Sequence, residues 1–436
     1  MRLSAFCAGL TCILFSGVAL AAPRVQSHGN STPPEPTVVH TGLHQKQLPP
    51  ARVDAALKDY EHWLDQLAAE NRTAGLATAV VIDGKVRYER TIGYADANTG
   101  AKVEPDTVFR LASLSKAFAT ALTGLLIRRG YLTWDTRLAT VLPFFKLRSV
   151  DASQQATVRD ILSQSIGLPP NAYDNLLSEG VSYAELERRL DTVPLTCDPG
   201  DCYGYQNIAF SLIGDVIHAE TGQFFVQLVD QYLFLPLGMT NASYGLGGLE
   251  ASPSWARPHY KRGNRWIAYQ PNDHFYVAPA AGVNASIRDM EQWLIAQMGG
   301  RPMVLPDALL EVLHTPVIAT PSERMFSNWR RARLKHAYYA LGWRVYDYAG
   351  HTLIFHAGAV QGYRSMIGFF PEYNAGAVVM WNSESGTPSG LLPELFDALL
   401  GLPHQDWAGL DRPDPPAAHR KPVRRKAAPK RARRKH

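Results

Sequence analysis

The chain has 436 residues, of which 46% are hydrophobic and 19% are charged. This composition supplies a large core and excludes a wholly disordered protein. The formal net charge of +5 is unevenly placed, because ten Lys and Arg residues and no acids lie in the segment from Ala418 to the end. Without these ten charges the rest of the chain carries −5, so the basic character belongs to the tail.

The first 21 residues are typical of an export signal peptide. Arg2 supplies a positive charge, an apolar run extends from Leu10 to Leu20, and Ala19 and Ala21 fit the small-x-small cleavage rule. The run is too short for a membrane-spanning helix, and no other segment reaches about 18 apolar residues. We therefore expect a periplasmic or secreted protein with no transmembrane span in its mature chain. An uncleaved N-terminal anchor is the alternative.

A linker, a folded domain and a tail are expected after the signal. Residues 22–50 are rich in Pro, Ser, Thr and His without periodicity, which predicts a disordered linker before a domain over 51–402. Residues 403–436 are mostly Pro, Ala, Lys and Arg, which predicts a disordered basic tail. Attachment to anionic envelope polymers is the alternative to a simple solvated extension. Nucleic acid is not an expected partner of an exported protein.

The first predicted elements of the domain are a helix, a hairpin and a second helix. The first helix starts near Ala51, and a β-hairpin covers 77–96 with its turn at Asp83-Gly84. The second helix begins near 113 and ends at Gly130. The apolar residues of the first helix recur at helical spacing, at Val53, Leu57, Tyr60 and Leu64.

The later segments alternate between helical and strand-like patterns. Residues 135–300 are mostly helical and are broken by Pro and Gly clusters, whereas 339–382 return to strand-like alternation before a helix at 391–401. Strands at both ends with helices between them predict an α/β fold, in which one sheet is built from both ends of the domain and a helical segment is inserted.

The cysteines point to one possible disulfide. Cys7 and Cys12 would leave with the signal, and Cys197 and Cys202 flank the turn sequence Asp-Pro-Gly-Asp. An oxidising compartment favours pairing of the remaining two. Two free thiols stay possible, because a sequence does not supply the Cα distance that decides pairing.

Ser113 and Lys116 form a Ser-x-x-Lys pair at the start of the predicted second helix. Residues three apart share one helix face, so the amine can approach the hydroxyl. Lysine can remove the serine proton only if its pKa falls by about three units, which costs roughly 4 kcal/mol and is within the reach of burial. Ser115 is a weaker nucleophile candidate, because Phe118 and not a base follows it at the same spacing.

Two further clusters could serve a serine nucleophile. A Tyr-x-Asn pair occurs at Tyr205 and Asn207 and again at Tyr173 and Asn175, and spacing alone does not choose between them. Tyrosine can relay protons, and asparagine can bind a substrate carbonyl. His356 precedes Gly358 by two residues in a strand-like run, where the imidazole could donate a hydrogen bond to substrate.

The three stretches together resemble the serine β-lactamase and penicillin-binding protein superfamily. They are most similar to its branch around the class C β-lactamases, with related esterases and D-aminopeptidases. That family shows Ser-x-x-Lys, Tyr-x-Asn and a Lys/His/Trp-x-Gly triplet in this order, and the similarity spans about 55–400. The flanking segments agree, at LTWDTRLATVLPFF, TVRDILSQSIGLPP, PGDCYGYQNIAFSLIGDVI, FLPLGM and YALGW.

The resemblance implies a serine β-lactamase/DD-peptidase-like fold, with a mixed, largely antiparallel sheet flanked by helices. It implies that Ser113 is the acylated nucleophile, Lys116 its base and Tyr205 the proton shuttle, since Pro199-Gly200 before Tyr205 matches the family pattern. The implied substrate-binding positions are Asn207, His356, Gly358 and Ala359, with the backbone N–H groups of Ser113 and Ala359 as the oxyanion hole.

Two positions depart from the family pattern. His356 stands where β-lactamases of this branch usually have a lysine that holds the substrate carboxylate, and a neutral imidazole holds an anion less well. Gln164 stands where the family usually has histidine, which we interpret as structural variation, with a changed site mouth as the alternative.

We therefore expect an exported serine hydrolase that acts through a Ser acyl-enzyme on an amide, β-lactam or ester carbonyl. Its substrate would be a small molecule or a peptide, and the mechanism needs no metal or cofactor. The alternative is a catalytically idle envelope protein that binds penicillin or peptidoglycan.

Overall fold

The computed structural model describes residues 46–273 and 277–411. The predicted signal peptide, most of the predicted linker and the basic segment from Ala418 lie outside these residues.

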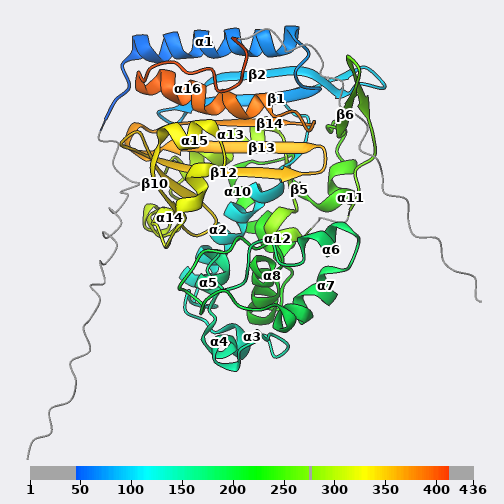
Figure 1. The fold of residues 1–436 in the computed structure, drawn as a ribbon, viewed down its shortest axis with the longest axis vertical. Helices are drawn as coiled ribbons and strands as arrows, with labels where there is room; N and C mark the ends of the chain where they lie inside the picture. The colour runs from blue at the N-terminus through cyan, green and yellow to red at the C-terminus, as the bar shows by residue number, and fades with distance from the viewer. Residues whose placement is uncertain (1–45, 274–276, 412–436) are drawn as a thin grey trace, which may run out of the picture. The chain divides into compact units, whose positions relative to one another are not determined.

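A nine-stranded sheet forms the centre of the fold, in the order β3-β2-β1-β14-β13-β12-β11-β10-β9 (Figure 1). Its neighbouring strands are antiparallel. The first long strand, β1 (Gly75–Ile82), pairs with the last, β14 (Ala375–Trp381), so both ends of the domain build one sheet, as predicted. The other strands are β2 (Lys85–Asp96), β3 (Ala101–Lys102), β9 (Ile318–Ala319), β10 (Leu334–Tyr339), β11 (Arg344–Tyr348), β12 (His351–Val360) and β13 (Tyr363–Phe370).

Two hydrophobic cores lie on the two faces of this sheet. Because side chains alternate along a strand, Ala77 and Ala79 of β1 belong to one core, whereas Leu76 and Val80 belong to the other. The second core is covered by α1 (Pro50–Ala69) and α16 (Leu391–Leu400), which lie together on one face (Figure 1). In α1 the predicted apolar positions are buried except Leu57, which is half-buried.

The first core joins the sheet to the helical part of the chain. The long helices of this part are α2 (Ser115–Arg128), α8 (Ile208–Thr221) and α13 (Ile287–Gln297), and their buried apolar side chains pack together in this core. A three-stranded sheet of β4 (Phe109–Arg110), β8 (Val283–Ala285) and β5 (Ser243–Tyr244) lies in the order β4-β8-β5. The shorter helices are α3 (Leu138–Val141), α4 (Val150–Gln155), α5 (Val158–Leu162), α6 (Asp174–Ser178), α7 (Tyr183–Leu186), α9 (Phe225–Val229), α10 (Leu235–Leu237), α11 (Gly245–Glu250), α12 (Ala278–Ala281), α14 (Asp307–His314) and α15 (Asn328–Arg333).

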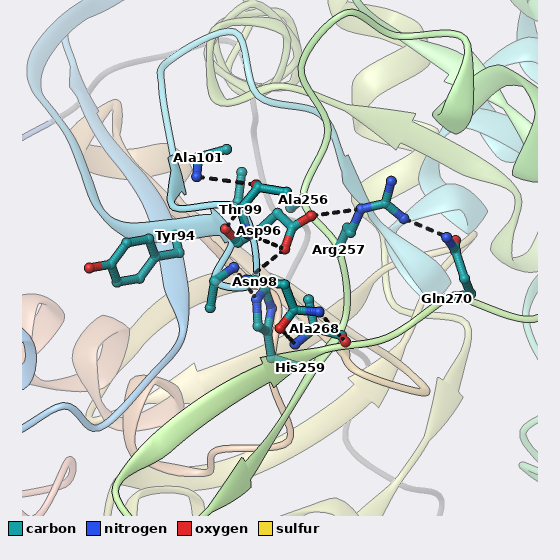
Figure 2. Close-up of polar contacts among 12 residues, drawn as sticks. Tyr94, Asp96, Asn98, Thr99, Ala101, Ala256, Arg257, His259, Ala268 and Gln270 are labelled. Atoms are coloured by element: carbon teal, nitrogen blue, oxygen red, sulfur yellow. Dashed lines mark hydrogen bonds and ion pairs between the residues drawn. The ribbon is translucent and has the colours of Figure 1, made fainter.

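A separate hairpin, β6 (His259–Arg262) and β7 (Arg265–Ala268), is fastened to the turn after β2 (Figure 2). Arg257 forms an ion pair with Asp96 at 3.0 Å, and the side-chain amide of Asn98 bonds both backbone groups of Ala268. These contacts join segments far apart in the sequence and fix the path of the chain just before residues 269–273.

The folded part of the chain extends beyond the predicted boundary at 402. Residues 403–411 pack against the domain: Ala408 and Leu410 are buried, the backbone N–H of Ala408 donates to Glu394, and the Trp407 indole donates to Asp397. Composition alone did not reveal these anchoring contacts. Within the described ranges, no helix is both long and apolar enough to cross a membrane.

Candidate active site

Ser113 lies in a tight turn between β4 and α2. The turn is a 3₁₀ segment, Ala112–Leu114, and α2 begins at Ser115. Ser113 therefore precedes the α-helix, whereas the sequence analysis predicted that the helix begins near 113. Ala112 has φ of +49°, a left-handed conformation that costs a non-glycine residue roughly 1–2 kcal/mol. The hydroxyl of Ser115 is fully buried and donates to the Ala112 carbonyl at 2.6 Å, which makes it a structural group of the turn.

Lys116 lies in the first turn of α2, and its side chain is completely buried. Its Nζ is 2.6 Å from Asn207 Oδ1, 3.1 Å from the Ala280 carbonyl oxygen and 3.4 Å from Ser113 Oγ. The first two partners are acceptors only, so they take the two N–H groups of a neutral amine. The lone pair of that amine is then left for the proton of Ser113, which is the arrangement a general base requires.

The electrostatic surroundings favour the neutral amine. Burial lowers the pKa of Lys116 from its usual 10.5 to about 7; the charge of Asp174 opposes this shift, and the positive charge of Arg344 adds to it. A pKa near neutrality gives a base that is partly unprotonated at pH 7 and still accepts a proton.

Tyr205 faces the same amine from the loop before α8. Lys116 Nζ lies 4.7 Å from the centre of the Tyr205 ring. Burial raises the pKa of the Tyr205 phenol, although Arg344 and a hydrogen bond with Ser113 lower it. The phenol therefore stays protonated at neutral pH, which suits a group that relays a proton and does not suit a first base.

Gln164 holds the loop that carries Tyr205. Its buried side chain accepts from the Gln206 backbone N–H at 2.6 Å and donates to the Gln206 carbonyl at 3.2 Å. Its own carbonyl accepts from the Gly204 N–H. These bonds fit the structural interpretation of Gln164.

In the preceding segment Cys197 and Cys202 form a disulfide, with their Cα atoms 6.2 Å apart.

Asn207 connects Lys116 to an acidic side chain. Its amide oxygen accepts from Lys116, and its Nδ2 donates to Asp174 Oδ2 at 2.7 Å. The Asn207 side chain makes no capping bond to α8, so capping does not explain its position. One N–H of the Asn207 amide is therefore used by Asp174.

Asp174 is a site residue that the sequence analysis missed. It is the middle residue of the second Tyr-x-Asn match, whose Tyr173 donates instead to the Arg189 carbonyl, outside the pocket lining. Asn171 and Tyr173 both have positive φ, 58° and 65°, and the Asn171 N–H donates to the Tyr205 carbonyl at 2.7 Å. This turn brings Asp174 to the site, and no local sequence signal marks it.

The sheet contributes the far end of β12, where β11 no longer pairs with it. A Cβ on Gly358 would lie 2.2 Å from the Leu111 carbonyl oxygen and 3.1 Å from Ser113 N, so only glycine allows this approach. Ala359 follows directly and lines the pocket. The strand thus lies against the turn of Ser113, and the backbone of residue 359 is next to the nucleophile.

His356 differs from the expected substrate contact. It is completely buried and is not among the residues that line the pocket. Its Nδ1 lies 2.9 Å from the Ala357 carbonyl and its Nε2 lies 3.2 Å from the Tyr339 hydroxyl. Burial, assisted by the positive charges of Arg344 and Lys116, lowers the pKa of His356 well below 6.5. The imidazole is therefore neutral, has a partner at each nitrogen, and lies with its ring centre 6.5 Å from that of Tyr205.

Arg344 is the second site residue that the analysis missed, although it follows the quoted segment YALGW directly. It lines the pocket, pairs with Glu323 at 2.6 Å and donates to the Tyr203 hydroxyl at 3.2 Å. Its guanidinium lies 5.5 Å from the centre of the Tyr205 ring. It is the fixed positive charge that favours neutral Lys116.

These residues surround a cavity of about 480 Å³. Arg364, Met366 and Trp381 line its sheet side, and Arg364 forms an ion pair with Glu384 at the mouth. The further lining residues are Ser113, Asn171, Asp174, Tyr205, Asn207, Arg344, Ala357, Gly358, Ala359, Ser365, Ser385, Gly386 and Ser389. The structure therefore brings together Ser113, Lys116, Tyr205 and Asn207 as predicted from the resemblance.

Comparison with known sequences agrees with this geometry. The sequence model of the Beta-lactamase family matches residues 60–401, so the chain belongs to that family. Protein flp of Staphylococcus aureus is 25% identical, over 71% of this chain and 60% of its own length. Unguisins hydrolase ungD of Aspergillus violaceofuscus is 25% identical, over 80% and 65%. The chain thus spans less than two thirds of these relatives.

Solved structures show the same fold. The octameric penicillin-binding protein homologue from Pyrococcus abyssi superposes with a TM-score of 0.71 at 22% identity, over 79% of this chain and 78% of that one. EstCE1, a hydrolase with promiscuous acyltransferase activity, gives 0.67 at 19% identity, over 80% and 99%. These neighbours confirm the predicted fold class.

Proposed function

We propose that this protein hydrolyses esters or amides through an acyl-enzyme on Ser113. The observation that carries this proposal is the buried Lys116 amine. Asn207 Oδ1 and the Ala280 carbonyl accept its two hydrogens, and Ser113 Oγ lies 3.4 Å from Nζ, where the nitrogen lone pair can take the hydroxyl proton. Ser113 Oγ attacks the carbonyl carbon while its proton passes to Lys116 Nζ. The oxyanion faces the backbone N–H groups of Ser113 and Ala359, because β12 lies against the Ser113 turn.

The second half of the cycle needs the protonated phenol of Tyr205. When the tetrahedral intermediate collapses, the bond to the leaving group breaks and that group takes the proton of Lys116 through Tyr205. Water then attacks the acyl carbon and gives up a proton to the neutral Lys116. The bond between that carbon and Ser113 Oγ breaks, Oγ takes the proton back from Lys116, and the acid is released.

Small esters and unstrained amides are better candidate substrates than β-lactams. A β-lactam carries a carboxylate, and the position where a lysine would hold it is taken by His356, which is neutral and faces Tyr339. The word hydrolase in the names of EstCE1 and unguisins hydrolase supports hydrolysis as the reaction.

We further propose that the enzyme works outside the cytoplasm, on the strength of the predicted signal peptide at 1–21. The disulfide at Cys197–Cys202 fits an oxidising compartment. Cell fractionation tests this, and protein found only in the cytoplasm would contradict it. N-terminal sequencing of the exported protein then shows whether the signal peptide is removed.

The test of the activity compares wild type, Ser113→Ala and Ser385→Ala on a short-chain p-nitrophenyl ester and a chromogenic cephalosporin. Ser385 also lines the pocket but has no lysine beside it, so its variant controls for loss of any pocket hydroxyl. We expect ester hydrolysis in wild type and Ser385→Ala, with none above background in Ser113→Ala. Full activity in Ser113→Ala would discard the proposal. A stable covalent adduct with a penicillin and no turnover of any substrate would favour the idle binding protein instead.

A further inference from the structure

Asp174 is an acidic residue of the pocket lining, and one of its carboxylate oxygens has no hydrogen-bond partner among the described residues. Its Oδ2 accepts from Asn207 at 2.7 Å, whereas its Oδ1 is buried and has no hydrogen-bond partner in the described part of the chain. None of the ion pairs among residues 46–273 and 277–411 includes it. The other acid of the pocket lining, Glu384, pairs with Arg364 and accepts from the Gly362 N–H.

The cation nearest to Asp174 along the hydrogen-bond chain is Lys116, which Asn207 connects to it. Lys116 must lose its charge to act as a base. Burial raises the pKa of Asp174, whereas the hydrogen bond from Asn207 and the charge of protonated Lys116 lower it. When Lys116 is neutral, the carboxylate loses this counter-charge. Asp174 also opposes the deprotonation of Lys116, because its negative charge raises the pKa of the amine. Asp174 lines the pocket, so a cation on the substrate is the partner that its Oδ1 lacks.

We infer that Asp174 binds an ammonium group on the acyl part of the substrate, so that the enzyme selects amino-acyl esters or amides over acyl groups without an amine. This inference rests on the proposed function. An ammonium in the pocket supplies the missing counter-charge and forms a charge-assisted hydrogen bond with the carboxylate.

Binding of the ammonium also prepares the base. Once Asp174 is neutralised by the substrate, it no longer holds a proton on Lys116. The other charged and titratable groups facing that amine are Arg344, Tyr205 and His356, and none of them carries a negative charge at neutral pH. The correct substrate therefore activates the enzyme that cleaves it.

The test uses three methyl esters with the same three-carbon acyl chain: alanine, β-alanine and propionate. Acid release is followed in wild type, Asp174→Asn and Glu179→Gln. Asparagine keeps the shape of residue 174 and an acceptor for Asn207. Glu179 follows the same helix, is exposed and lies outside the pocket lining.

We expect wild type and Glu179→Gln to prefer at least one amino-acyl ester over propionate by roughly ten- to hundredfold in kcat/KM, the range of a hydrogen bond to a charged group. In Asp174→Asn the ratio falls to about one. The acid limb of its pH profile moves to lower pH, because the charge that raised the pKa of Lys116 is gone. A loss of equal size on all three esters would mean that Asp174 only positions Asn207, and the inference would be wrong.

A binding measurement separates this inference from the proposed function. Calorimetry of alanine and β-alanine methyl esters with Ser113→Ala detects ammonium recognition without catalysis. If neither ester binds more tightly than methyl propionate, the inference fails even where Ser113-dependent hydrolysis is found. If one binds through Asp174 and no ester is ever hydrolysed, the proposed function fails and the ammonium site stands.

Discussion

The two walls of the pocket differ in what they bury. The helical wall is formed by Ser113, Asp174, Tyr205 and Asn207, which connect to the buried Lys116. The pKa values of Lys116, Asp174 and Tyr205 are shifted. The sheet wall, formed by Ala357, Ala359, Arg364, Met366 and Trp381, combines small and apolar side chains with one ion pair at the mouth. Under the proposed function, proton transfer belongs to the helical wall, whereas the sheet wall shapes and binds the substrate.

Removal of the base should have the largest effect. We expect Lys116→Met to lower kcat/KM on a short-chain ester by about a thousandfold, within the range for general bases. Wild-type activity should rise with pH through about 7 as Lys116 loses its proton, and this limb should vanish in the variant. An undiminished rate in Lys116→Met would mean that the helical wall does not supply the base.

A change where the two walls meet should come next. The added Cβ of Gly358→Ala would lie 2.2 Å from a backbone oxygen of residue 111, so β12 must move away from the Ser113 turn. Such a displacement costs about a hundredfold in rate when catalytic groups lose alignment. Gly386 also lines the pocket, but a Cβ there meets nothing within 4 Å, so Gly386→Ala is the matched control. Equal kinetics of the two variants would show that contact between the walls is not needed.

Burial of Lys116 should also lower the free energy of unfolding, by an amount that depends on pH. Folded Lys116 has a pKa of about 7 against a usual 10.5, so between these values the unfolded chain binds more protons and folded wild type gains stability as pH rises. Lys116→Met lacks this dependence. Its free energy of unfolding relative to wild type should therefore fall by about 2–3 kcal/mol from pH 7 to 9. Urea denaturation at both pH values measures it, and a constant difference would mean that Lys116 is not desolvated.

A change at the mouth of the sheet wall should have the smallest effect. Arg364 and Glu384 are partly exposed, and exposed ion pairs contribute about 0–1 kcal/mol. We expect Arg364→Gln to leave the melting temperature and kcat nearly unchanged and to alter KM by no more than about fivefold. A large fall in kcat would place a catalytic contribution on the sheet wall and would remove the distinction between the walls.

Local patterns predicted the parts of this site that lie within one segment. Ser113 and Lys116 are three residues apart, so their proximity follows from the turn and helix that contain them. Helix α1 was predicted in the same way from its apolar spacing, and the strands within 339–382 from their alternation. His356 lies on the same face of β12 as Gly358, and its ring centre is 6.5 Å from that of Tyr205. The sequence did not show that the Tyr339 hydroxyl, on a strand farther along the sheet, contacts its Nε2.

The sequence by itself determined the candidate nucleophile and base, the prediction that strands from both ends of the domain share one sheet, and membership of the family. Only the tertiary structure decided that Asp174 and Arg344, from α6 and β11, act on Lys116 with opposite electrostatic effects. It also decided that His356 is fully buried, with its Nε2 in contact with the Tyr339 hydroxyl. The physical reason is that hydrogen bonds and desolvation depend on distances between segments, and packing sets those distances.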